Sequence, residues 1–461
     1  PASADDLRGA LVSAYQTNRA LLAARAQQRA TDETVAIERA DGLPAASASA
    51  THTEVLRDED ATGLAPKRQF NGSLSLGVPI YSGGAVRSSV RAAKTRVEAG
   101  QADLRGTESA VFSQVVAAYL DVLLSESVVG LNRNVVRVLA TNLDATRDRF
   151  EIGDLTRTDV AQSQARLELA RGDARAAEAN LITARERYIQ LVGQVPTALE
   201  SPPPLPGLPE DVSSAVAVAL EHNPDLIAAR ERARAAEFDI DVAGSTRLPR
   251  VEVFTGGSYQ DFYGTYGGAT HRNFDQNSLG ATAGVRATIP LFQGGRPAAL
   301  RRQAQARAAA AMENEIAAER DVIAQVRAAY SSWRASNEII ASSQVAVDAA
   351  GLSLEGVRAE NSVGNRTILD ILDAERELLE TQVRLVTARR NAYVAGFSLL
   401  AAMGRAEAQD LGLDGGVLYD PDTNYRRVRG KVFDWESDPA PKPQATRTVD
   451  TPAQDGSIPA R

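Results

Sequence analysis

The spacing of apolar residues along this chain switches between the period of a helix and that of a strand. Apolar residues recur every three or four positions from 5 to about 39, which predicts an amphipathic helix. At 69–81 and, for longer, at 278–292, apolar residues alternate with small or polar ones, which predicts strands. Weaker strand patterns lie near 46–56 and 250–260. Four strands among helices are therefore expected.

The longest predicted helices have no proline to interrupt them. From 84 to about 150 the pattern predicts one helix of roughly 65 residues, about 100 Å long. Shorter helices are expected at 155–192 and 211–243. Two short helices stacked end to end would match one long helix, so we expect these two to stack. By the same argument, 367–403 is expected to stack on the first helix of the chain.

The chain contains an internal repeat. The segment 79–193 recurs without a gap at 290–404, so that Tyr119 corresponds to Tyr330, 211 positions later. The motif Pro-Ile-Tyr-Ser-Gly-Gly at the start of the first copy becomes Pro-Leu-Phe-Gln-Gly-Gly in the second. Duplicated halves of this kind suggest a wall that closes on itself rather than an enzyme with a pocket.

A second match sets the outer bounds of the repeats. Asn18 corresponds to Asn223 at an offset of 205. We interpret 1–209 as the first structural repeat, 210–413 as the second, and 414–461 as a tail. The tail is rich in Pro, Asp, Arg and Thr and is expected to be partly disordered, from about Asp438 onward.

Composition narrows the class of protein. Hydrophobic residues make up 44% of the chain and aromatic residues only 5%, which favours long packed helices. The net charge of −8 argues against nucleic-acid binding. No run of about 18 apolar residues is found, so we expect no transmembrane helix, and any membrane crossing would have to use strands.

Candidate catalytic chemistry is scarce. The chain has no cysteine, and its three histidines, His52, His222 and His271, are far apart in sequence. We find no Ser/His/Asp set, no phosphate-binding glycine loop and no cluster of metal ligands. We therefore expect no enzyme activity, no cofactor and no bound metal.

Four strands cannot close a barrel. Two chains would give eight strands, enough only for a barrel filled by its own side chains, whereas three chains would give twelve and an open lumen. The long helices also need lateral neighbours to cover their apolar stripes. A homotrimer is the smallest assembly expected to conduct.

Over about residues 5–413 the chain resembles the TolC family of trimeric outer-membrane ducts. The resemblance rests on the duplicated Pro-(Ile/Leu)-(Tyr/Phe)-x-Gly-Gly junctions and on the paired turns at 153–160 and 363–374. It implies a mainly α fold in which a twelve-stranded membrane β-barrel continues into a long antiparallel coiled-coil barrel of helices. It also implies a Gram-negative outer-membrane location, with the helices extending into the periplasm.

The second of these turns carries candidate gate residues. Asp370 and Asp373 are three apart, so they share a helix face. The family resemblance implies that in a trimer these faces converge on the axis as two rings of carboxylates, and such rings favour cations. In the first repeat Asp159 and Gln162 stand at these positions, so only one turn has the double carboxylate. The alternative is a solvated helix N-terminus, where the helix dipole stabilises acidic residues.

Arg366 is a poor match for a helix N-terminus, which suggests that it has a partner. The family resemblance implies that it links this turn to Thr158 and Asp159 of the neighbouring chain. Asn361 stands where family members often place a tyrosine in the closed-state network, so that network is expected to be weaker here or to use different contacts.

The resemblance implies export through an outer-membrane duct with a periplasmic adaptor and an inner-membrane ABC transporter or other pump. Type I protein secretion is favoured, because 418–429 resembles tails of members that export proteins and no N-terminal cysteine is present for a lipid. The alternatives are efflux of drugs or other small molecules and, in another class, a periplasmic coiled-coil scaffold. The alternating, duplicated strands count against a scaffold.

Overall fold

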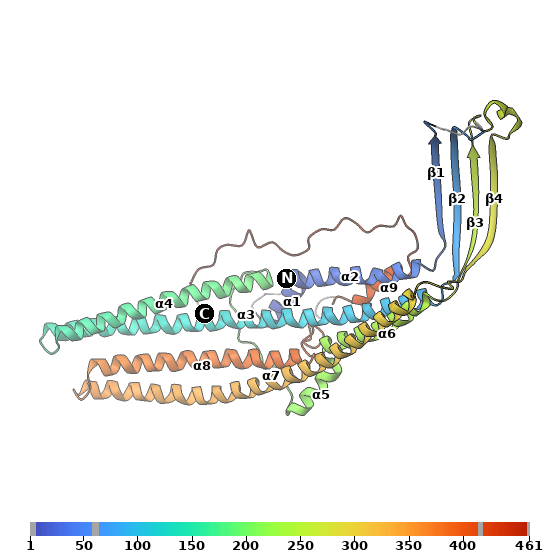
Figure 1. Cartoon of the computed structure of the whole chain (residues 1–461). Coiled ribbons are helices and arrows are strands. Elements are labelled where there is room, and N and C mark those ends of the chain that lie inside the picture. Colours follow the sequence, from blue (N-terminus) through green and yellow to red (C-terminus); the bar gives the residue numbers. More distant parts are fainter. Residues whose placement is uncertain (1–5, 58–63, 414–417, 459–461) are drawn as a thin grey trace.

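The computed structural model shows a curved sheet standing at one end of a long layer of helices (Figure 1). It describes residues 6–57, 64–413 and 418–458. The other residues, which include the first four and the last three of the predicted tail, lie outside the described part of the chain.

Each repeat supplies two short helices, two strands, one long helix and one returning helix. In the first repeat these are α1 (Leu7–Thr17), α2 (Arg19–Ala40), β1 (Ala45–Glu54), β2 (Arg68–Tyr81), α3 (Ala85–Glu151) and α4 (Arg157–Val192). In the second they are α5 (Val212–His222), α6 (Pro224–Ser245), β3 (Arg250–Asp261), β4 (Asn277–Thr288), α7 (Arg296–Ser362) and α8 (Ile368–Ala402). A 3₁₀ turn, η1 (Gly268–Asn273), precedes β4, and a last helix, α9 (Pro421–Val428), follows the repeats. The prediction of a mainly helical chain with four strands and a tandem repeat is confirmed.

The Gly-Gly junctions explain where the long helices begin. Gly84 and Gly295 occupy the N-cap positions of α3 and α7 with φ of 83° and 80°, a left-handed conformation that glycine adopts without strain. Both helices then run for 67 residues, about 100 Å at 1.5 Å per residue. β4 ends at Thr288, earlier than predicted, just before Pro290, which has no N–H for the ladder.

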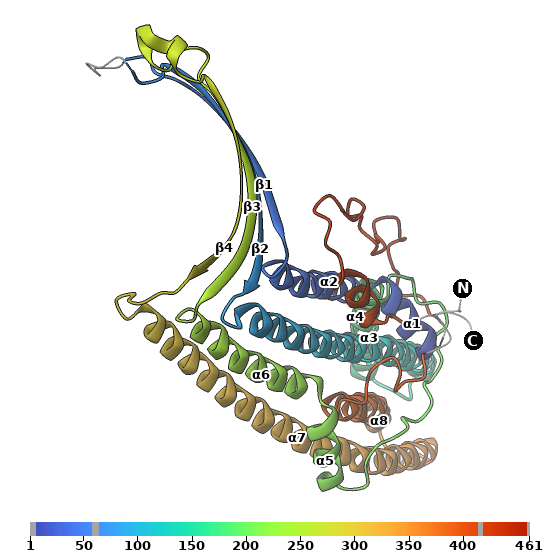
Figure 2. The same cartoon turned by 90° about the vertical axis from the view of Figure 1, so that its right-hand side faces the viewer.

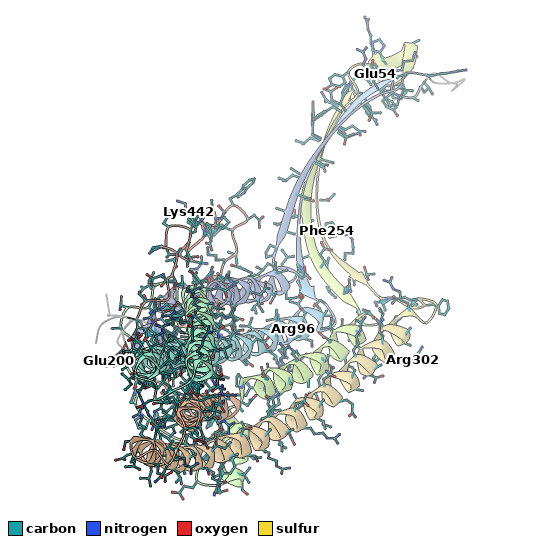
Figure 3. The ribbon with its side chains drawn as sticks, turned by 90° about the vertical axis from the view of Figure 1, so that its left-hand side faces the viewer. Glu54, Arg96, Glu200, Phe254, Arg302 and Lys442 are labelled. Atoms are coloured by element: carbon teal, nitrogen blue, oxygen red, sulfur yellow. The ribbon has the colours of Figure 1, made fainter. Side chains whose placement is uncertain are left out.

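The sheet is antiparallel, in the order β1-β2-β3-β4, and it bends strongly along its length (Figure 2). One face exposes large apolar side chains, among them Leu74 at 62% and Leu279 at 85% of their full accessible surface. On β1 and β2, hydroxyl pairs such as Ser47 with Ser75 bond across the strands at 2.8 Å. No described helix covers the faces of the sheet along the middle of its length, and Glu54 lies at its far tip (Figure 3).

The short helices are broken where single helices were expected. Asn18 ends α1 and begins α2, and Asn223 does the same between α5 and α6. Each side-chain Oδ1 accepts hydrogen bonds from two N–H groups in the first turn of the incoming helix. The capping bonds favour a helix start at these points, so the predicted helices at 5–39 and 211–243 are each two helices.

The predicted stacking partners are wrong. The amide of Asn18 donates to Leu191 O at 3.0 Å, so α4 ends on the start of α2. The amide of Asn223 donates to Ala402 O at 2.9 Å, so α8 ends on the start of α6. The physical reason is the linker at 193–211, which passes from α3 to α7: Tyr119 of α3 and Tyr330 of α7 donate to the carbonyls of Glu200 and Glu210 near its two ends.

The layer therefore has four helices side by side both near the sheet and near the hairpin tips. Near the sheet the order is α2, α3, α6, α7, and farther away it is α4, α3, α8, α7 (Figures 1 and 2). The largest core lies at mid-length, where the fully buried side chains include Phe112, Tyr119, Leu181 and Tyr188.

Contrary to the expectation from sequence, α3 contains a window that is long and apolar enough to cross a membrane. The mean hydropathy of that window is 1.4. Because α3 packs against α2, α4, α6 and α8, its apolar content has partners within the helical layer.

The tail contacts the helical layer at two places. α9 packs on α2, where Asn424 donates to the buried carboxylate of Asp32 at 2.7 Å. The segment beyond Asp438 lacks helix and strand among its described residues, yet it returns along the layer. There Arg185 donates to Asp455 O at 2.9 Å and Arg133 to Gly456 O at 2.9 Å. These backbone contacts attach the segment beyond Asp438 to α3 and α4, and its partial disorder stays a prediction.

We expect Asn18→Ala and Asn223→Ala each to destabilise the fold by about 1 to 2 kcal/mol, because each removes a helix cap and a bond between stacked helices. Thermal unfolding followed by circular dichroism measures the loss. Asn134→Ala, at an exposed position within α3, is the control and should be neutral or slightly stabilising. Equal stability of the three variants would contradict this role for Asn18 and Asn223.

Candidate functional site

Helices α3 and α4 form one hairpin and α7 and α8 form a second, and the turns at their far ends are built in the same way. Thr156 precedes α4 and Thr367 precedes α8, and each forms a capping box with the aspartate three residues later, Asp159 or Asp370. In this motif the threonine side chain accepts an N–H from the helix while the carboxylate accepts from the threonine. Both hairpin turns therefore end in a carboxylate held by its own helix.

Asp370 is oriented by this cap. Its Oδ2 accepts hydrogen bonds from Thr367 Oγ1 at 2.7 Å and Thr367 N at 2.9 Å. These hydrogen bonds lower the pKa of Asp370 from its ordinary value, and they lower the pKa of Asp159 in the first hairpin in the same way. In the single chain both carboxylates are thus stabilised in the ionised form, as the helix-terminus alternative expects.

Asp373 has a different partner, which sequence reasoning missed. Its Oδ1 accepts from Arg166 Nη2 at 2.8 Å, an ion pair that joins α8 to α4 and so links the two hairpins. A signal for this pair was present in the repeat. Gln162 and Arg166 in the first copy correspond to Asp373 and Glu377 in the second, so the charges at two positions one helical turn apart have diverged.

Among the described residues, the polar partners of Arg366 lie in its own hairpin. Its Nε donates to Glu360 Oε2 at 2.7 Å, and its Nη1 lies 3.9 Å from Asp370 Oδ1. Asn361 donates to Arg366 O at 2.7 Å, which fixes the turn. Thr158 is exposed near the start of α4. The structure brings Arg366 and Asp370 together, and the link to Thr158 and Asp159 of a neighbouring chain stays a prediction.

Packing holds the second hairpin against the first above the charged tips. Leu372 of α8 is buried among Leu139, Leu143 and Leu167 of α3 and α4. The carboxylate of Glu375, with only 7% of its side chain exposed, is paired with Arg358 of α7. A cavity of about 310 Å³ lies beside this contact, between the two hairpins. A few side chains therefore form the contact between the two hairpins near their tips.

In the residues that the structure describes, no group of three or more histidine, aspartate or glutamate side chains could hold a metal ion. The chemistry that this site offers is electrostatic. It presents carboxylates and arginines at the exposed tips of two long hairpins.

Comparison with known proteins identifies a family. The family described as outer membrane efflux protein matches residues 10–194 and 215–405, which fall one in each repeat. The outer membrane efflux protein BepC of Brucella suis is 32% identical over 438 residues, covering 94% of this chain and 92% of the relative. The outer membrane protein TolC of Vibrio cholerae is 28% identical, with 88% and 92% covered.

Two further proteins are similar. The alkaline protease secretion protein AprF of Pseudomonas aeruginosa is 26% identical, with 70% of this chain and 67% of the relative covered. The crystal structure of the Campylobacter jejuni CmeC outer membrane channel superposes with a TM-score of 0.77 at 17% identity, covering 92% of this chain and 89% of that one. The last similarity shows a shared fold.

The ion pair between hairpins can be tested by charge reversal. We expect Arg166→Asp to speed hydrogen–deuterium exchange at residues 151–160 and 362–372 by roughly fivefold, because an exposed pair contributes about 1 kcal/mol or less. Arg166→Asp combined with Asp373→Arg should restore slow exchange. Arg376→Asp, which breaks only a pair with Glu380 within α8, is the control. Fast exchange in the combined variant would argue against the pair.

Proposed function

This chain belongs to the outer membrane efflux protein family, and from that premise we propose that three copies form a duct for export across the outer membrane. It is an outer-membrane protein whose helices extend into the periplasm. The observation that carries the proposal is the sheet, which is open at both edges and apolar on one exposed face, standing on a helical layer about 100 Å long.

The two faces of the sheet suit lipid on one side and water on the other. Leu74, Leu279 and Val285 would meet the acyl chains, whereas the serine pairs between β1 and β2 would line the lumen. Four strands from each of three chains make a twelve-stranded barrel, which is wide enough to leave a lumen.

The helical layer carries apolar residues at both of its edges. On the α7 side Ile339, Val345 and Leu352 are exposed, and on the opposite side Ile37 of α2 and Leu169 of α4 are exposed. Water-exposed side chains of this size on a long helix favour lateral neighbours. Joining one edge to the other in three copies would continue the barrel into the periplasm.

The hairpin tips are the proposed gate. In the trimer Asp370 and Asp373 would form rings of carboxylates at the periplasmic entrance, and Arg366 would bind Thr158 and Asp159 of the neighbouring chain. Arg366 would then exchange its bond to Glu360 for an intermolecular one. Opening would require the second hairpin to part from the first, so the pair of Arg166 with Asp373 would break as well.

The duct would depend on partners for energy and for cargo, since we propose no catalytic reaction for it. We propose a periplasmic adaptor and an inner-membrane ABC transporter or other pump that engage the hairpin tips. The tips suit this role because they are the part of the chain farthest from the sheet (Figure 1). Family membership favours this duct over the periplasmic scaffold.

For the cargo we favour type I protein secretion. Similarity to AprF, a protein named for protease secretion, supports it. The resemblance of the segment at 418–429, which forms α9, to tails of protein-exporting ducts also supports it. Efflux of small molecules is the second candidate, because BepC, at higher identity over nearly the whole chain, is named an efflux protein.

Channel recordings test the gate. In planar lipid bilayers we expect cation-selective conductance that a trivalent cation on the periplasmic side blocks, because carboxylate rings attract cations. Asp370→Ala/Asp373→Ala should weaken the block by about tenfold or more. Glu377→Ala/Glu380→Ala, farther along α8, removes the same charge and should change it little. Block that persists in the first variant would exclude these residues as the gate, and absence of any conductance would favour the scaffold.

Deletion of the gene from its own bacterium tests the cargo. Type I secretion predicts that one or a few proteins disappear from the culture medium while sensitivity to dyes and detergents changes little. Efflux predicts the reverse. The wild-type gene on a plasmid should restore whichever function is lost, and an unchanged medium would contradict the secretion proposal.

A further inference from the structure

A basic cavity lies where the sheet joins the helices of the first repeat. It has a volume of about 920 Å³ and is bounded by α2, the end of β2, the first turns of α3 and the residues that follow α9. Three separate parts of the chain thus meet around it. It is distant from the hairpin tips, at the opposite end of α3 (Figure 1).

The charge of the lining is one-sided. Five basic residues contribute to it, and none of its lining residues is acidic. The five are Arg39, Arg87, Arg91, Lys94 and Arg429. Arg39 donates to Arg429 O at 3.0 Å, which ties α2 to the end of α9 and closes one side. Gathering like charges in one cavity is unfavourable, so an anion there would relieve their repulsion.

Comparison of the repeats shows that the junction itself does not require these charges. Where α3 has Arg87, Arg91 and Lys94, α7 has Ala298, Arg302 and Gln305. The corresponding cavity beside α7 is smaller, about 320 Å³, and is lined by two basic residues, Arg250 and Arg296. α9, which supplies Arg429 at its end, packs on α2. The first junction therefore has a larger cavity with more basic residues than the second, within an otherwise duplicated architecture.

Its position relative to the membrane points to the ligand. Leu74 and Leu76 lie on the exposed apolar face of β2, and Ile80, an exposed residue at the irregularity where the register with β3 shifts, also lines the cavity. The cavity thus adjoins the point where the apolar face ends, which is the level of the lipid headgroups on the periplasmic side. Tyr81 and Tyr425 in the lining suit such an interface, because their rings are apolar and their hydroxyls polar.

We propose that this cavity binds the phosphate-bearing headgroup of an anionic phospholipid of the periplasmic leaflet, with the acyl chains lying along the apolar face of β2. The proposal rests on the outer-membrane placement described above. Arginine recognises phosphate through paired N–H donors, and each basic residue near a membrane surface adds to the attraction of anionic lipid. A bound lipid would join α2, α3 and the tail at the membrane surface.

Native mass spectrometry of the detergent-purified trimer tests the proposal. Delipidated protein is mixed with phosphatidylglycerol or with phosphatidylcholine of the same chain length, and lipids bound per chain are counted. The test variant is Arg87→Gln/Arg91→Gln/Lys94→Gln. The matched control, Arg137→Gln/Arg147→Gln/Arg149→Gln, removes the same charge from the far end of the same helix. Arg91→Glu is a second variant that changes one exposed position, should the triple variant fail to fold.

We expect one phosphatidylglycerol per chain, bound about tenfold or more tightly than phosphatidylcholine, since several cations contribute. Both test variants should lose this preference, and the control should keep it. Equal binding of the two lipids by wild type, or an unchanged preference in the test variants, would overturn the proposal. Displacement of the lipid by millimolar inorganic phosphate would also overturn it, in favour of a free-anion site. The same spectra report the trimer, so failure of the proposed duct would be seen separately.

Discussion

Backbone hydrogen bonding at the edges of the sheet is the constraint on which the rest of the structure depends. β1 and β4 each have one side with no partner strand among the described residues, and lipid offers no hydrogen bond to their N–H and C=O groups. The free groups can be satisfied only if β4 of one copy pairs with β1 of the next, antiparallel, until the sheet closes. The helical layer obeys the same geometry, because it is continuous with the strands and has apolar residues at both of its edges.

The internal repeat lets the chain satisfy this constraint with few specific side-chain interactions. Asn18 and Asn223 cap the starts of α2 and α6, so that α4 ends on α2 and α8 ends on α6. Each pair of shorter helices runs beside one long helix, α3 or α7, and the helical layer has four helices side by side both near the sheet and near the hairpin tips. The copies have diverged at both ends of that layer. At the hairpin tips the charges at 162 and 166 differ from those at 373 and 377, and at the membrane end the first repeat has the larger cavity with more basic residues. At these two places the repeats differ in charge, and the interactions that each repeat makes there differ as well.

Most of the architecture could be predicted from sequence because it depends on periodicity. Strict alternation identified β2 and β4, weaker patterns identified β1 and β3, and the absence of proline identified the long helices. Which helices stack could not be predicted, because periodicity does not tell on which side of α3 the linker at 193–211 leaves. The pairing of Arg166 with Asp373 was hidden because it joins residues 207 positions apart, although the divergence of the repeats pointed to it. The contacts of the tail near Asp455 lack any periodic signal, since they run through backbone carbonyls.

Closure of the sheet by three copies is open to direct observation. Electron cryo-microscopy of the protein in lipid nanodiscs should show a threefold complex in which twelve strands form one closed barrel, with β4 of each copy hydrogen-bonded to β1 of the next. A complex of two or four copies, or a sheet that stays open at β1 and β4 within the bilayer, would contradict this assembly.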